Sequence, residues 1–113
     1  MKTKNFKQIS KKYPKAWDRF KEKETFNWDF SDYSIEDMCA WIGANYHLRD
    51  LYDFFDSEGI VIEIAFDYDN NTFYSSIEKA NGVSLFTSVD CTTRPEAEEQ
   101  AFLKAFEILE NKL

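Results

Sequence analysis

Hydrophobic residues recur every three or four positions between Thr93 and Leu113, and polar residues fill most positions between them. This spacing places the hydrophobic side chains on one face of an α-helix. Thr93 and Glu96 have the spacing of a capping box, and Pro95 stands in the first turn, where its missing N–H costs no hydrogen bond. The pattern predicts an amphipathic helix over 93–113. Its hydrophobic face comprises Ala101, Phe102, Ala105, Phe106, Ile108, Leu109 and Leu113, with Glu98 as the one polar residue inside it.

From Ile60 the hydrophobic period changes to two, which is the period of a β-strand with one buried face. Turn-forming Asp and Asn residues follow at 69–71, and a second strand is expected over 73–79. The dipeptide Asn81-Gly82 is preferred in two-residue hairpins and predicts a tight turn into a third strand over 83–89. The segment 60–89 is therefore expected to form a three-stranded antiparallel meander.

The first half of the chain is typical of helices rich in aromatic residues. Pro14 predicts the first turn of a helix over 13–23, Ser34 caps a second helix, and Gly59 ends a further helical segment. The expected hydrophobic faces comprise Tyr13, Ala16, Trp17 and Phe20, then Ile35, Met38, Trp41 and Ile42, then Leu51, Tyr52, Phe54 and Phe55. Phe26, Trp28 and Phe30 alternate with polar residues, which fits either a short strand or an extended connector.

These elements predict an α+β fold with N-terminal helices, a three-stranded antiparallel β-meander and a C-terminal helix packed on the sheet. A chain of 113 residues suits a single domain with one core. The expected parts are a basic N-terminal arm over 1–12, a helical part over 13–59, the meander over 60–89 and the final helix over 93–113. Within the arm, Phe6 and Ile9 with the adjacent lysines indicate a short helical turn or a packed arm. With 43% hydrophobic residues, three Gly and two Pro, the composition excludes a disordered chain.

The net charge of −7 is unevenly distributed along the chain. Residues 1–23 hold nine basic and two acidic side chains, so the remaining ninety residues carry a charge of −14. A basic arm on an acidic body can dock on that body, in its own or another subunit, or bind an external polyanion. Nucleic-acid binding is therefore the alternative function, and a homo-oligomer is a possible assembly. The residues expected to contact phosphates are Lys4, Lys7, Lys11, Lys12, Lys15 and Arg19.

No motif for catalysis or for a cofactor stands out. The chain has one histidine, which excludes a site built on two histidines, and three glycines cannot form a phosphate-binding loop. Cys39 and His47 are the one conceivable nucleophile and base, but eight residues with Gly43 between them do not favour that geometry. We expect a non-enzymatic protein without cofactor.

One partial match to a calcium-binding loop lies at the first hairpin. Asp67, Asp69, Asn71, Ser75 and Glu78 occupy liganding positions of an EF-hand loop. That loop needs Gly where this chain has Thr72, and a strand over 73–79 would carry Glu78 away from the aspartates. The pattern therefore favours a polar hairpin turn without metal.

No secretory signal or membrane span is evident, and the two cysteines suit reduced structural thiols, so we expect a cytoplasmic protein. The leading functional hypothesis is a macromolecule-binding module whose partner is another protein. It would bind through its acidic surface or its exposed aromatic residues.

The segments Arg49–Ile60 (RDLYDFFDSEGI) and Thr93–Glu110 (TRPEAEEQAFLKAFEILE) resemble a family of short uncharacterised proteins of Bacteroidales genomes, their phages and mobile elements. That resemblance covers about the last sixty-five residues and implies a bacterial or phage intracellular protein. It carries no assigned activity.

The order of a helix, three antiparallel strands and a helix with small residues at Ala97, Ala101 and Ala105 is similar to the double-stranded RNA-binding domain. In that domain a lysine cluster at the start of the final helix grips phosphates. Here the corresponding residues are Arg94, Pro95, Glu96, Glu98 and Glu99, and their carboxylates would repel phosphate. The resemblance therefore implies shared packing and not RNA binding.

Overall fold

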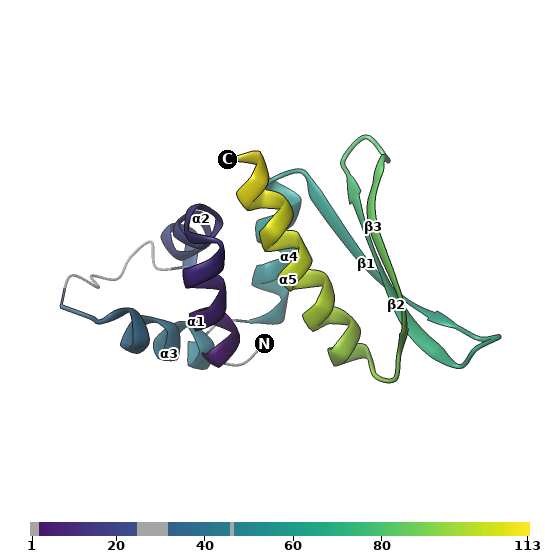
Figure 1. The fold of residues 1–113 in the computed structure, drawn as a ribbon, viewed down its shortest axis with the longest axis horizontal. Coiled ribbons are helices and arrows are strands. Elements are labelled where there is room, and N and C mark those ends of the chain that lie inside the picture. Colours follow the sequence, from purple (N-terminus) through teal and green to yellow (C-terminus); the bar gives the residue numbers. More distant parts are fainter. Residues whose placement is uncertain (1–2, 25–31, 46) are drawn as a thin grey trace. The chain divides into compact units, whose positions relative to one another are not determined.

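The computed structural model describes residues 3–24, 32–45 and 47–113 and has an α+β fold (Figure 1). The chain divides into two compact units, of which unit 1 holds the residues up to Asp50 together with Phe106–Leu113, and unit 2 holds Leu51–Ala105. The expectation of one domain over 1–113 stays a prediction. The alternation of Phe26, Trp28 and Phe30 lies outside the described residues.

Unit 1 is built from helices. It contains α1 (Thr3–Lys12), α2 (Pro14–Glu24) and α3 (Ile35–Asn45), the first residues of α4 (Leu48–Ser57) and the last turns of α5 (Arg94–Lys112). The basic N-terminal segment, expected to form a short helical turn or a packed arm, is a helix of ten residues. Phe6 and Ile9 are buried on one of its faces. The core of the unit comprises Phe6, Ile9, Ala16, Trp17, Phe20, Cys39, Ile42, Phe106 and Leu109.

Aromatic rings dominate the contacts inside unit 1. The Phe20 ring stacks on Phe6 with 5.9 Å between centroids and meets the edge of Phe106 at 5.7 Å. Trp17 lies 5.8 Å from Phe6 and 6.0 Å from Phe20. The backbone N–H of Ala16 also donates a hydrogen bond of 2.9 Å to the Glu110 carboxylate, so α2 is held to the end of α5 by both apolar and polar contacts.

Unit 2 contains most of α4, a three-stranded sheet and the first turns of α5. The strands are β1 (Ile60–Asp67), β2 (Thr72–Lys79) and β3 (Ser84–Cys91), antiparallel and in the order β1-β2-β3. This confirms the meander. Its two hairpins end at opposite ends of the sheet (Figure 1).

One face of the sheet is covered by α5. Ile62 and Ile77 are register partners on this face, and both are buried. The helix contributes the small side chains of Ala97 and Ala101, and its Lys104 ammonium lies 5.7 Å from the centre of the Phe86 ring on β3. The burial of these side chains and the contact of Lys104 with Phe86 confirm the predicted packing of the C-terminal helix on the sheet.

The helix starts carry the predicted caps, with one shift. The Ser34 hydroxyl accepts a hydrogen bond of 3.1 Å from the backbone N–H of Asp37, and Thr93 accepts one of 3.3 Å from Glu96. The Glu96 carboxylate, however, receives the backbone N–H and the hydroxyl of Thr92, at 3.2 and 2.9 Å. In a capping box the Glu96 carboxylate would accept the backbone N–H of Thr93. Here it accepts the N–H of Thr92, the preceding residue.

The prediction of a two-residue Asn81-Gly82 hairpin is wrong. The Lys79 carbonyl accepts a hydrogen bond from Gly82, and the Lys79 N–H donates to Val83, which closes a loop of three residues. Gly82 has a φ of +88°, whereas a two-residue type I′ turn would need a positive φ at Asn81 as well. The Asn81 side chain instead accepts the N–H of Val83 at 3.1 Å.

The Phe102 ring should be the side chain whose loss most destabilises unit 2. It is fully buried between Tyr52 and Phe55, with centroid distances of 5.0 and 6.3 Å. We expect Phe102→Ala to lower the free energy of unfolding by about 3–5 kcal/mol, measured by urea denaturation. Val83→Ala, at a half-exposed position of the second hairpin, is the control and should change it by less than about 1 kcal/mol. Equal effects of the two substitutions would contradict this packing.

Candidate interaction surfaces

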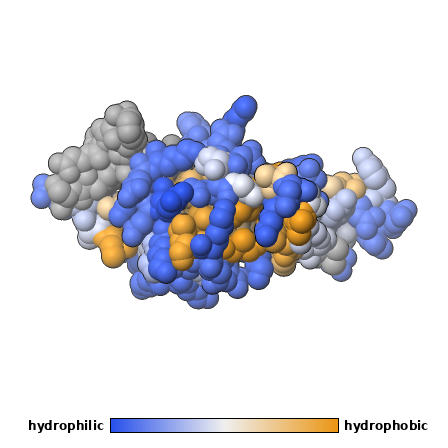
Figure 2. Space-filling view, turned by 90° about the horizontal axis from the view of Figure 1, so that it is seen from above, coloured by the Kyte–Doolittle hydropathy of each residue, from blue (hydrophilic) through white to orange (hydrophobic). Residues whose placement is uncertain are grey.

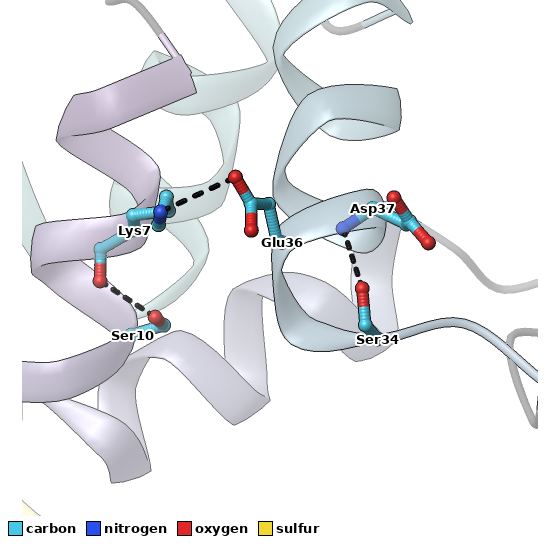
Figure 3. A network of polar contacts seen from close by, with 5 residues as sticks. All are labelled: Lys7, Ser10, Ser34, Glu36 and Asp37. Carbon is cyan, nitrogen blue, oxygen red and sulfur yellow. Dashed lines mark hydrogen bonds and ion pairs between the residues drawn. The ribbon is translucent and has the colours of Figure 1, made fainter.

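The basic residues of α1 and α2 do not form one common cluster. Lys7 pairs with Glu36 of α3, with 3.5 Å between the ammonium and the carboxylate (Figure 3). The Lys15 ammonium lies 3.5 Å from the Leu113 carbonyl oxygen. Two of the predicted phosphate ligands are thus directed toward other parts of unit 1.

The remaining predicted phosphate ligands differ in their surroundings. Lys11 and Lys12 are exposed in the last turn of α1. Their positive charges interact favourably there with the negative end of the helix dipole. Arg19 is exposed on α2, and the side chain of Lys4 lies outside the described residues. Lys11 and Lys12 are therefore the exposed predicted ligands nearest the α1–α2 junction.

Unit 2 presents an acidic surface. It holds eleven acidic and three basic side chains, a net charge of −8. Two of those three bases lie over aromatic rings, Lys104 over Phe86 and Arg94 over Phe73. Figure 2 shows a face of the molecule that is mostly hydrophilic, with hydrophobic patches between. The exposed carboxylates of the unit are those of Asp53, Asp56, Glu63, Asp69, Asp90, Glu96 and Glu99.

Glu98 is buried although it carries a charge. The Tyr52 hydroxyl of α4 donates a hydrogen bond of 2.8 Å to its carboxylate, and only 8% of Glu98 is exposed. Burial raises the pKa of Tyr52 well above its ordinary value. The hydrogen bond to Glu98 and the negative charge of Glu98 raise the pKa of Tyr52 further. The pair therefore holds α4 against α5 as a neutral phenol donating to a carboxylate. The sequence marked Glu98 as anomalous but gave no sign of its partner.

The two cysteines are buried structural thiols. Burial raises the pKa of Cys39 in unit 1 and of Cys91 in unit 2, so neither is a ready thiolate at neutral pH. His47 is exposed, and its backbone N–H donates to the Asp50 carboxylate at 2.9 Å. The arrangement provides no activated nucleophile at Cys39.

The five positions that matched a calcium loop do not converge. Ser75 is buried on the covered face of the sheet, where its hydroxyl lies 2.7 Å from that of Ser88. Glu78 lies toward the opposite end of β2 from Thr72, where the loop containing Asp69 and Asn71 ends. Within residues 3–24, 32–45 and 47–113, no three His, Cys, Asp or Glu side chains could hold a metal ion.

The first hairpin instead carries a cluster of three aromatic rings, and an arginine of α5 lies over one of them. This cluster, here called the hairpin tip, consists of Phe66, Tyr68, Phe73 and Arg94. The Phe66 ring meets Tyr68 and Phe73 edge-on, each with a centroid distance of 5.0 Å. The Arg94 guanidinium lies 5.2 Å from the centre of the Phe73 ring. Neither this cluster nor the role of Arg94 was predicted from the sequence.

The turn that connects β1 to β2 is held in its conformation by Asp67. Its carboxylate accepts hydrogen bonds from the Asn70 side chain at 2.8 Å and from the backbone N–H of Asp69 at 3.0 Å. The Asn70 side chain is the main cause that lowers the pKa of Asp67, and the backbone N–H groups of Asp69 and Asn70 add to it. Asn71 completes the turn with a φ of +54°. The turn residues thus have conformational roles, as the sequence indicated.

Comparison with known proteins found no matching family model, no similar curated protein and no similar solved structure. Among the helices in the described parts of the chain, none is long and apolar enough to cross a membrane.

Asn70→Ala should raise the pKa of Asp67 toward its ordinary value, because the largest favourable contact of the carboxylate is lost. A carboxyl group whose pKa is lower in the folded state than in the unfolded chain stabilises the fold at pH values above its unfolded-state pKa. This stabilisation is lost as the pH falls through the folded-state pKa. The variant should therefore lose less stability on acidification. NMR titration of the Asp67 carboxyl carbon measures the shift, with Asn81→Ala in the second hairpin as control. An unchanged pKa in Asn70→Ala would contradict the assignment.

Proposed function

We propose that this chain is a non-enzymatic protein-binding module whose acidic unit 2 recognises a basic surface of another protein. The observation that supports this most directly is the charge of −8 on a unit of 55 residues, most of it on exposed side chains. Such a surface attracts basic partners, speeds their association and disfavours acidic ones. We place the interaction in the cytoplasm, since two free thiols suit a reducing compartment.

The double variant Asp56→Lys/Glu63→Lys should abolish or strongly weaken capture of the partner. Both side chains are exposed, and reversing them changes the charge of unit 2 from −8 to −4. Partners would be captured from extracts of cells that express the chain, at low and at moderate salt, and identified by mass spectrometry. We expect proteins with basic surfaces, captured less well as salt rises.

The matched control is Lys11→Glu/Lys12→Glu, which reverses two exposed charges of unit 1. It should leave capture unchanged. Capture that survives the reversal of Asp56 and Glu63 would overturn the proposal, and so would turnover of a metabolite in a substrate screen.

Nucleic-acid binding is the second candidate function, supported by the exposed Lys11 and Lys12 beside the α1–α2 junction. It predicts that a fluorescently labelled DNA or RNA duplex binds at low salt and dissociates steeply as salt rises, measured by anisotropy. Lys11→Glu/Lys12→Glu should then remove binding. Deleting α1 is unsuitable as a test because Phe6 and Ile9 belong to the core of unit 1. Failure of the duplex to bind at low salt would exclude this function.

A further inference from the structure

The face of the sheet that α5 covers extends past the start of the helix. Along β1, Ile60 and Ile62 are 2% and 7% exposed, whereas Ile64 and Phe66 on the same face are only half-buried. The register partner of Phe66 is Phe73, which is also half-buried. Since Arg94 is the first residue of α5 and lies over Phe73, the hairpin tip marks the end of the covered face.

The hairpin tip is more hydrophobic than its turn requires. The turn conformation depends on Asp67, Asn70 and Asn71, and none of its hydrogen bonds uses the side chain of Tyr68. Tyr68 is nevertheless 87% exposed while its ring meets the edge of Phe66. Tyrosine and arginine on a partly apolar patch are the residues that most often dominate binding energy at protein interfaces.

The charges around this patch select the sign of a partner. Asp67 and Asp69 flank Tyr68 in the chain, and the carboxylate of Asp69 is exposed. Arg94, the cation of the patch, is already placed over Phe73. An incoming cation would find aromatic faces and an exposed carboxylate together, whereas an incoming phosphate would meet the carboxylates of a unit with a charge of −8.

We propose that the hairpin tip binds a lysine- or arginine-bearing segment of another protein, with the cationic group over the ring of Tyr68 and paired with Asp69. The half-buried ring of Phe66, which contacts Tyr68, packs against the aliphatic part of that side chain. This inference rests on the proposed function and names the part of unit 2 that makes the contact.

The test uses the full chain and two sets of synthetic peptides of twelve residues. In one set lysine or arginine alternates with apolar residues, and in the other glutamate replaces each basic residue. We expect the basic peptides alone to shift the NMR signals of Tyr68 and Asp69. Tyr68→Ala should weaken binding about three- to tenfold and Tyr68→Phe should retain it, because the ring provides the contact. Val83→Ala, at the other hairpin, should leave affinity unchanged.

The outcomes separate this inference from the proposed function. If basic peptides bind Tyr68→Ala as well as the unmodified chain, and shift signals around Asp56 or Glu63 instead, the hairpin tip is not the site but an acidic binding surface remains. If no basic peptide binds, or if a DNA duplex shifts the signals of Tyr68, the inference is overturned. If the Tyr68→Ala variant also fails to capture the partner from cell extracts, the inference is supported for the natural partner as well as for the peptides.

Discussion

Burial of the inner face of α5 is the constraint on which both compact units depend. The first turns of this helix supply Ala97, Ala101 and Phe102 to the core of unit 2, and its later turns supply Phe106 and Leu109 to unit 1. A buried phenylalanine or leucine contributes about 1.5–3 kcal/mol through removal of apolar surface from water. Much of the marginal stability of a small protein can therefore rest on one helix. The cap at Thr92 and Thr93 fixes where that helix begins, and hence which residues face each core.

The elements with a strong hydrophobic period could be predicted from the sequence, and those set by tertiary contacts could not. The period of two from Ile60 gave the meander because each strand buries one face, and Thr93 with Glu96 gave the start of α5 because capping is a local interaction. The length of α1 was missed, since Phe6 and Ile9 are too few to show a period in so short a segment. The loop of the second hairpin was also predicted wrongly, because Asn-Gly fits both a two-residue turn and the end of a three-residue one.

The candidate surfaces illustrate the same limit. Charge can be counted from the sequence, so the contrast between the basic N-terminal segment and the acidic remainder was visible in advance. Which charges are engaged could not be predicted. Lys7 meets Glu36, and Glu98 meets Tyr52, across separations of 29 and 46 residues along the chain. Such pairs are fixed only when helices pack, and no local pattern contains them.

The contrast between Glu98 and Asp69 shows how packing assigns different roles to identical charges. Glu98 lies inside the hydrophobic face of α5, where an unpaired carboxylate would be costly, and it is retained with a phenol as donor. Asp69 lies in a turn beside an exposed tyrosine, where water solvates its carboxylate at no cost to the fold. Removing the charge of Glu98 alters a buried hydrogen bond, whereas removing that of Asp69 alters only what the surface attracts. Exposed residues of unit 2 such as Tyr68 and Asp69 can therefore change with little cost to the fold, and selection by a partner can act on them.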